Sequence, residues 1–237
     1  MRLLRSLAYA MIFYGLSPAF VTGAAFAGLF GARHLRSVAV AWCRFHRICA
    51  AMLAGVESRL EGTLPDGPLL IAVRHESFFE TLEAPIIFNA PVIVAKAELA
   101  RLPFWGGIAR RYGIIPVERT AGAAALRSMI RAARAARADG RSVLIFPEGS
   151  RIPHGETAAI RSGFAGLYAA LKLPVVPIAL DSGPRFRSFL KTPGPVRWRI
   201  GPVIAPGLPR DEVERRVATA INALNGGEGC SPRWEGH

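Results

Sequence analysis

The chain has 237 residues, carries a formal net charge of +13 and is 51% hydrophobic, with a mean hydropathy of +0.28. This length is enough for one large α/β domain with a substantial core. High positive charge combined with high hydropathy favours a surface that meets anionic lipid over one that binds nucleic acid, for which no motif is recognisable. The three cysteines lack metal-ligand spacing, so we expect no metal site.

The N-terminal segment, residues 6–32, contains no charged residue. It is longer than the roughly 20 apolar residues that span a bilayer. Because Gly15, Pro18 and Gly23 lie within it, two structures stay open: a spanning helix, or a broken helix that enters one leaflet. A cleaved signal peptide is the competing interpretation; the length of the run argues against it, as does the amphipathic sequence that follows directly.

Residues 33–55 interleave four arginines with apolar side chains. This pattern is typical of an amphipathic helix on lipid headgroups, with Trp42 near the interface; an ordinary helix packed on the domain is the alternative. Arginine is richer on the C-terminal flank of the apolar run, which predicts a cytoplasmic location for the rest of the chain. We therefore divide the chain into a membrane-associated helical segment, 1–55, and an α/β domain, 56–237.

The second part alternates short β-like runs with helical ones. We expect strands at 56–62, 69–74, 91–96, 114–119, 142–147, 175–180 and 196–204, and helices at 81–88, 120–140, 161–172 and 211–224. This alternation predicts an α/β fold with a mixed, largely parallel sheet flanked by helices on both faces. Sites in such sheets lie where strands end and helices begin, and four charged stretches fall there: RHESFFET, KAELARLPFWGGIARRYG, PVERT and FPEGSR.

The stretch RHESFFET, residues 74–81, offers a general base. A histidine takes a proton near neutral pH, and a carboxylate bonded to its other ring nitrogen fixes the tautomer. Glu80 could supply that carboxylate to His75. Alternatively, Ser77 and Glu80 form a helix capping box, and His75 is a turn histidine with no catalytic role. Since no G-x-S-x-G motif or activated cysteine is evident, direct attack by a substrate hydroxyl is favoured over an acyl-enzyme.

The stretch FPEGSR, residues 146–151, indicates a phosphate site. Pro147 and Gly149 predict a tight turn whose backbone N–H groups can face an anion, and Arg151 adds a planar donor. Arg119 and Lys96 end neighbouring strands and complete a possible cradle. The alternative for each is an ordinary surface side chain. A Walker loop is absent.

These motifs resemble those of the 1-acyl-glycerol-3-phosphate acyltransferases, the PlsC-like family of glycerolipid acyltransferases. That family has, in order, an H-x4-D block, a block ending in arginine, F-P-E-G-[ST]-R, and V-P-[IV]. The blocks match HESFFE, GIIPVER, FPEGSR and VVPIAL in this chain, over residues 56–210. One departure is that Glu80 stands where the family usually has aspartate.

The resemblance implies the glycerolipid acyltransferase fold and a reaction. His75 would take the proton of the sn-2 hydroxyl of lysophosphatidate, which would attack the thioester of acyl-CoA or acyl carrier protein, while Glu80 orients His75. No cofactor is implied beyond this co-substrate. The substrate-binding residues that the resemblance implies are Lys96, Arg119, Glu148, Gly149, Ser150 and Arg151. The expected acyl-donor or acyl-chain region includes Pro177, Phe104 and Trp105, although 102–108 could also be ordinary core.

Two other functions stay open. The same chemistry could serve another acceptor, such as a lyso-ornithine lipid or another lysophospholipid. A basic, non-catalytic protein that binds membrane surfaces is the second. Replacing His75 would separate them, because lipid binding would survive and acyl transfer would not.

Overall fold

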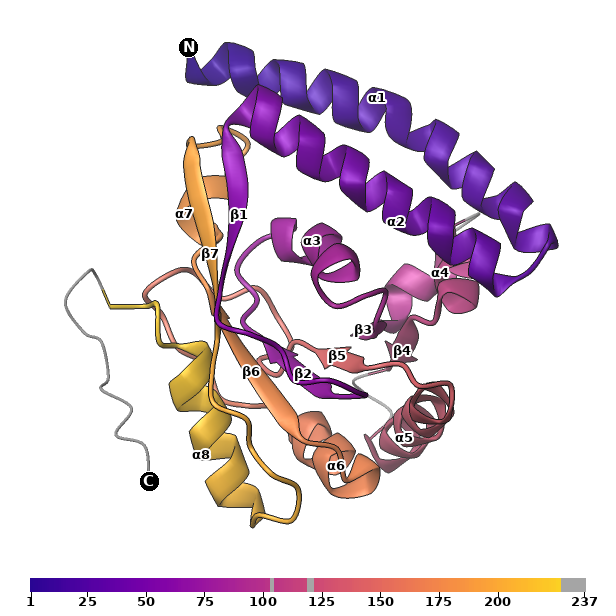
Figure 1. Cartoon of the computed structure of the whole chain (residues 1–237), viewed down its shortest axis with the longest axis vertical. Coiled ribbons are helices and arrows are strands. Elements are labelled where there is room, and N and C mark those ends of the chain that lie inside the picture. The colour runs from indigo at the N-terminus through magenta and orange to yellow at the C-terminus, as the bar shows by residue number, and fades with distance from the viewer. Residues whose placement is uncertain (103–104, 119–121, 227–237) are drawn as a thin grey trace.

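The computed structural model describes residues 1–102, 105–118 and 122–226. Its centre is a sheet in the strand order β1-β7-β6-β2-β5-β3-β4 (Figure 1). Neighbouring strands are parallel except β6 and β7, so the predicted mixed, largely parallel sheet is confirmed. The strands are β1 (Val56–Glu61), β2 (Leu70–Val73), β3 (Val92–Lys96), β4 (Ile115–Val117), β5 (Val143–Ile145), β6 (Val175–Leu180) and β7 (Gly194–Ile200).

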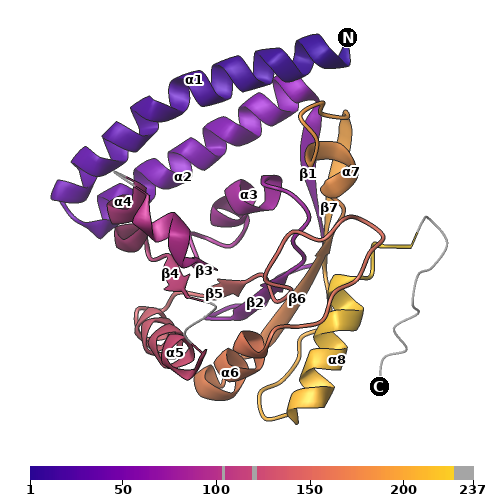
Figure 2. The same cartoon turned by 180° about the vertical axis from the view of Figure 1, so that it is seen from behind.

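Helices cover both faces of this sheet. One face carries α3 (Phe79–Ile87), α4 (Trp105–Tyr112) and the helix pair α1 (Arg2–Leu29) and α2 (Ala32–Cys49). The other carries α5 (Gly122–Ala138), α6 (Ser162–Leu171) and α8 (Arg210–Ile221), as Figures 1 and 2 show from opposite sides. Three shorter elements complete the described chain: the π-helical turn η1 (Ala50–Ala54), the 3-10 turn η2 (Ala97–Arg101) and α7 (Gly183–Phe186).

Two apolar cores follow from the alternation of side chains along each strand. In β2, Ile71 and Val73 pack beneath the N-terminal helices, whereas Leu70 and Ala72 face α5, α6 and α8. All four are buried, which explains why a central parallel strand reads as a continuous apolar run. The seven predicted strands and the four predicted helices all form, with ends that differ by a few residues.

The N-terminal segment forms one continuous helix of 28 residues that includes Pro18. The broken helix is therefore not observed. Helix α1 is long and apolar enough to cross a membrane by length and composition, and it exposes many large apolar side chains, among them Leu3, Leu4, Leu7, Met11, Ile12, Leu16 and Phe26. Such a surface is a candidate membrane segment.

Helix α2 lies between α1 and the sheet domain, in contact with α3 and α4 (Figure 1). Trp42 does not stand at a free surface: its Nε1–H donates to Ser17 Oγ at 2.9 Å, and its ring packs on Phe13 and Trp105. Helix α2 thus packs on the domain, while Arg33 and Arg44 stay exposed. Gly55, with φ of 72°, ends η1 in the left-handed region and turns the chain into β1.

Candidate active site

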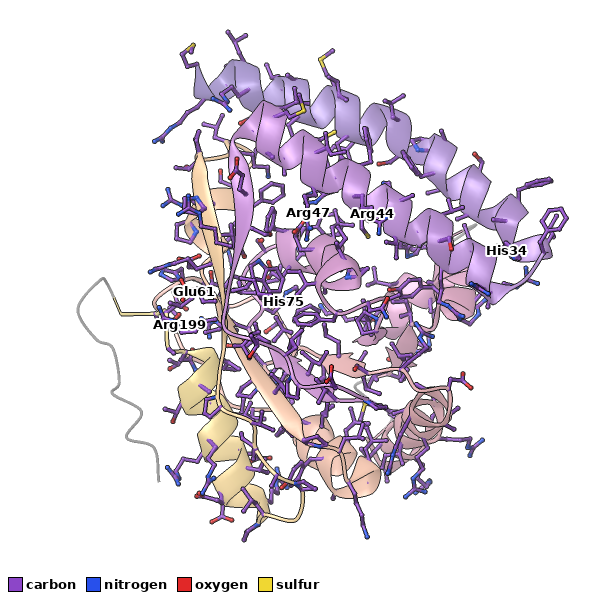
Figure 3. The ribbon with its side chains drawn as sticks, viewed as in Figure 1. His34, Arg44, Arg47, Glu61, His75 and Arg199 are labelled. Carbon is purple, nitrogen blue, oxygen red and sulfur yellow. The ribbon has the colours of Figure 1, made fainter. Side chains whose placement is uncertain are left out.

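The candidate site lies at the carboxyl ends of β2, β5 and β6, which are parallel neighbours in the sheet. His75 follows β2, the FPEGSR turn follows β5, and Ser182 follows β6. Figure 3 shows His75 near the middle of the molecule, far from His34 at the distal end of the helix pair. The topology therefore brings together stretches that are up to about a hundred residues apart, as expected for a parallel sheet.

His75 and Glu80 form a close pair. The Nδ1 atom of His75 lies 2.9 Å from Oε1 of Glu80. Glu80 is the second residue of α3 and is fully buried, whereas the side chain of His75 is 14% exposed. With Nδ1–H donating to the carboxylate, the Nε2 atom carries the ring's free lone pair. No hydrogen-bond partner of Nε2 lies among the described residues.

Glu80 also accepts hydrogen bonds from the turn between β2 and α3. The backbone N–H groups of Glu76 and Ser77 both donate to Oε1 at 2.6 Å, and the Ser77 hydroxyl donates to Oε2 at 2.9 Å. Glu80 therefore caps the helix and pairs with His75 at once, so the two interpretations of the sequence are compatible.

A second hydroxyl reaches Glu80 from Ser182, two residues after β6. Ser182 Oγ donates to Oε2 at 2.7 Å and lies 2.8 Å from Ser77 Oγ. Burial alone would raise the pKa of Glu80, but the hydrogen bond and charge of His75 and the donors of Ser77 and Ser182 outweigh it and hold that pKa below its ordinary value. The carboxylate is thus ionised at neutral pH, as a partner for an imidazolium must be.

Phe146 fixes the other side of the imidazole. Its ring stacks on His75 with centroids 4.0 Å apart and an interplanar angle of 21°. The backbone of His75 is tied to the same loop, because Ile152 N donates to the His75 carbonyl at 2.8 Å. The imidazole is therefore held by a carboxylate at one edge and by the Phe146 ring on one face. Because the side chain is already fixed, it loses less conformational entropy when a substrate binds.

Arg74, next to His75, is fully buried and serves as a structural cation. Its guanidinium pairs with Glu148 and with Glu76, and donates to Asn222 Oδ1 at 2.7 Å and to the Pro153 carbonyl at 3.1 Å. It therefore joins β2, the loop after β5 and α8. Buried charges of this kind need such complete pairing.

Glu148 lies inside this network. It is 1% exposed, and its Oε2 atom accepts the backbone N–H of His75 at 3.1 Å. We predicted a substrate contact for Glu148, but its position assigns the carboxylate to Arg74 and to the turn that carries His75. A carboxylate turned inward in this way does not oppose a phosphate at the surface of the site.

Arg151 is the FPEGSR residue that reaches the surface. The turn closes through Gly149, whose N–H donates to the Phe146 carbonyl at 2.9 Å and whose φ of 72° favours glycine. Ser150 is half-buried beside it. Arg151 is exposed, lies 5.8 Å from the ring of Phe78 and lines a pocket of about 440 Å³.

The other predicted residues are dispersed. Lys96 is exposed at the end of β3, and Pro177 is buried within β6, opposite Ala72 of β2. Trp105 lines a second, apolar pocket between α1, α2, α3 and α4, together with Phe78, Trp42 and Ile108. Arg119 and Phe104 lie outside the described residues.

The sequence interpretation missed three contributors to these sites. Ser182 lies two residues after the VVPIAL strand, and its place at the same sheet edge was the available signal. Arg187 and Lys191 line the pocket of Arg151, but they come from the loop after α7, which carries no motif. Nothing in their local sequence distinguishes them from surface cations.

Known proteins share both the sequence and the fold of this chain. Residues 55–181 match the family described as Acyltransferase. A 1-acyl-sn-glycerol-3-phosphate acyltransferase of Pseudomonas aeruginosa is 32% identical over 179 residues, which cover 74% of this chain and 69% of that protein. A protein of the same name from Borreliella burgdorferi is 30% identical over 143 residues, covering 59% of this chain and 56% of that protein.

The fold is similar to that of the 1-acyl-sn-glycerophosphate (LPA) acyltransferase PlsC from Thermotoga maritima. The TM-score is 0.75 with 19% sequence identity, and the superposition covers 95% of this chain and 96% of that one. The likeness extends over nearly the whole chain, the N-terminal helices included.

Proposed function

Since the chain belongs to the acyltransferase family, in its PlsC-like branch, we propose that it transfers a fatty acyl group from acyl-CoA or acyl carrier protein to the sn-2 hydroxyl of lysophosphatidate, which yields phosphatidate. The pairing of His75 with Glu80, 2.9 Å apart, carries this proposal. It supports a base whose tautomer is set and whose protonated form is stabilised. The names of the relatives support the acceptor.

The proposed step is a direct transfer. Nε2 of His75 takes the proton of the acceptor hydroxyl as that oxygen bonds to the thioester carbonyl carbon. The tetrahedral intermediate then expels the thiolate, which receives the proton from His75. General-base action of this kind is worth roughly 10²–10⁴ in rate. Backbone N–H groups near the two motifs would stabilise the oxyanion, and no cofactor is required besides the acyl donor.

The surrounding residues have distinct proposed roles. Arg151, with Gly149 and Ser150 of its turn and with Arg119 and Lys96 from neighbouring strand ends, would bind the glycerol phosphate. Glu148 would act through Arg74 and the backbone of His75. Trp105 and Phe104 would border the fatty chain, and the apolar pocket lined by Trp105 supports this. Pro177 would act only through the packing of β6.

The exposed apolar face of α1 supports membrane association, with the catalytic domain on the cytoplasmic side of the inner membrane as the proposed location. Both the acceptor and the product are amphiphiles, so a site beneath the helix pair suits substrates that enter from a bilayer. Vesicles of anionic phospholipid would retain the full-length chain in a flotation assay, and a chain that stays unbound without detergent would contradict this location.

A product assay tests the function. The purified full-length protein would receive lysophosphatidate with a long-chain acyl-CoA, or with acyl carrier protein, while thiol release and phosphatidate are measured together. Equal amounts of both products are expected. Thiol release without phosphatidate would show that the acceptor is wrong, and lyso-ornithine lipid or another lysophospholipid would then be supplied in its place.

A further inference from the structure

The pocket of Arg151 is lined by three cations and no carboxylate. Arg187 and Lys191 join Arg151 from the loop after α7, and Ser77 and Phe78 line the pocket from the turn that follows His75. Its remaining lining residues are Tyr14, Phe186, Ser188 and Phe189. A cavity of about 440 Å³ with this composition can hold a polar headgroup and favours an anionic one.

The loop that carries the two cations is anchored on both sides. Lys191 N donates to Ser6 Oγ of α1 at 2.9 Å, and an Arg187 guanidinium N–H donates to the carbonyl of Glu76 at 3.2 Å. The second bond ties the loop to the residue that follows His75. Arg187 and Lys191 are therefore positioned by the fold before any ligand binds.

None of the three cations that line the pocket has a carboxylate counter-ion in the described part of the chain. No carboxylate there lies within 4.0 Å of Arg151, Arg187 or Lys191. Lys191 Nζ donates to the carbonyls of Phe186 and Ser188 and lies 4.1 Å from the centroid of the Phe186 ring. Burial lowers the pKa of Lys191 to about 8. A half-buried ammonium without a carboxylate is expected to gain from a bound anion.

We infer that Arg187 and Lys191 complete, with Arg151, a binding site for a phosphate monoester, and that its ligand is the headgroup phosphate of the lysolipid acceptor. This inference rests on the proposed function and adds two binding residues outside the four sequence blocks. The acyl donor is the other source of phosphate, since coenzyme A carries phosphate groups. Two of the residues that line the pocket favour the acceptor as the ligand.

The first of these residues is Tyr14, through which the candidate membrane helix α1 lines this pocket. The second is Phe78, which lines both this pocket and the apolar pocket of Trp105. A molecule with a charged head and a fatty chain can therefore occupy the two pockets on either side of Phe78. A lysophosphatidate has this composition, with its free hydroxyl between head and chain.

Equilibrium binding to the full-length protein in detergent tests the inference without turnover. Each protein would carry His75→Ala, and the probes would be 1-oleoyl lysophosphatidate, the matching monoacylglycerol and palmitoyl-CoA. The test variant is Arg187→Gln with Lys191→Gln. The matched control is Arg127→Gln with Arg131→Gln, which removes the same charge from exposed positions of α5.

The test variant should bind lysophosphatidate about tenfold more weakly or worse, because two charge-assisted hydrogen bonds are lost. Its affinity for monoacylglycerol and palmitoyl-CoA should not change, and the control should stay within about twofold for every probe. Unchanged affinity for lysophosphatidate would overturn the site. Equal loss for monoacylglycerol, or loss confined to palmitoyl-CoA, would overturn the assignment to the acceptor phosphate.

Arg187→Gln alone gives the same test if the double variant is unstable, since the Arg187 side chain is exposed. Because binding is measured on proteins that lack His75, the result does not depend on the proposed reaction. An absence of acyl transfer in the wild type would refute the function and leave the site standing, whereas unchanged binding would refute the site and leave the function standing.

Discussion

Nδ1 of His75 lies 2.9 Å from a carboxylate oxygen of Glu80, across the turn between β2 and α3. The side chain of Glu80 is one methylene longer than that of the aspartate that is usual at this position in PlsC-like acyltransferases. The longer side chain is accommodated because hydroxyl groups hydrogen-bond to its carboxylate. Ser77 and Ser182 both donate to the second carboxylate oxygen. The site is therefore built for glutamate, and this has consequences for substitutions at that position.

We expect Glu80→Asp to lower kcat. Shortening the side chain withdraws the carboxylate by about 1.5 Å, so it cannot reach Nδ1 of His75 and the two serine hydroxyls together. A loss of about tenfold is expected for Glu80→Asp and of about 10² or more for Glu80→Gln, which places an amide among donors. Steady-state kinetics with saturating acceptor would measure both. An Asp variant as active as the wild type would contradict the inference that the site is built for glutamate.

Ser182→Ala tests the support behind that carboxylate. Ser182 is fully buried and lies two residues after β6, so it can reach the reacting atoms only through Glu80. Loss of one hydrogen bond to a charged group is worth about 1.5–3 kcal/mol, hence a fall in kcat of about tenfold or more with little change in KM. A purely structural role would instead lower the unfolding temperature and leave kcat of the folded fraction intact.

The fold was largely predictable because its signals are local. Strands such as 175–180 are continuous apolar runs bounded by prolines, glycines and charges, and each became a strand. The N-terminal helix was harder. Pro18 and two glycines suggested a break, yet α1 continues through them, because packing against α2 outweighs the one backbone hydrogen bond that proline removes.

The site was predictable where one motif carries both partners. His75 and Glu80 are five residues apart, so their pairing could be inferred from the turn between them. Ser182, Arg187 and Lys191 reach the site through strand β6 and the loop after α7, more than a hundred residues further on. Their contribution depends on the order of strands in the sheet, and no local pattern encodes that order.

Another buried carboxylate, that of Glu83, should make the free energy of unfolding depend on pH. Glu83 of α3 accepts from Arg47 Nε at 3.0 Å and from Ser58 Oγ at 2.7 Å, which joins α2 and β1 to α3. Burial raises its pKa, but the neighbouring His46 and the hydrogen bonds from Arg47 and Ser58 outweigh this, so the pKa of Glu83 lies below the ordinary 4.5. The stabilisation is then complete above pH 4.5 and is lost as pH falls through the lower folded-state pKa.

Glu83→Gln measures that contribution. At pH 7 we expect about 3 kcal/mol lower stability, since Arg47 loses its charged partner. The difference from the wild type should shrink as the pH is lowered below 4.5. Thermal unfolding of both proteins in detergent from pH 7 to pH 3 would show this. A difference that stays constant over this range would contradict the linkage.

The proposed phosphate site should bind lysophosphatidate more weakly at alkaline pH. With its pKa lowered to about 8, Lys191 loses its proton between pH 7 and pH 9, a range in which a phosphate monoester is already dianionic. Lysophosphatidate affinity should fall about severalfold over that range. Lys191→Arg, which stays charged, should abolish the fall. The other ionisable groups near Lys191 are Tyr9, Tyr14 and His46.

The apolar pocket predicts a chain-length effect. Ala39 of α2 lines it together with Trp105, so Ala39→Phe fills space that the fatty chain of the acceptor would occupy. The ratio of activity with a twelve-carbon lysophosphatidate to that with an eighteen-carbon lysophosphatidate should rise by about tenfold, as removal of several buried methylenes implies. Competition between the two acceptors would measure the ratio. An unchanged ratio would show that the acceptor chain lies elsewhere.

The most direct test of the account compares phosphatidate formation by the wild type, His75→Ala and His34→Ala. His34 is an exposed histidine at the far end of the helix pair, so it controls for loss of an imidazole (Figure 3). We predict that His75→Ala lowers kcat by about 10² or more while His34→Ala equals the wild type, and that lysophosphatidate still binds to both. A His75→Ala protein that forms phosphatidate at the wild-type rate would contradict the account.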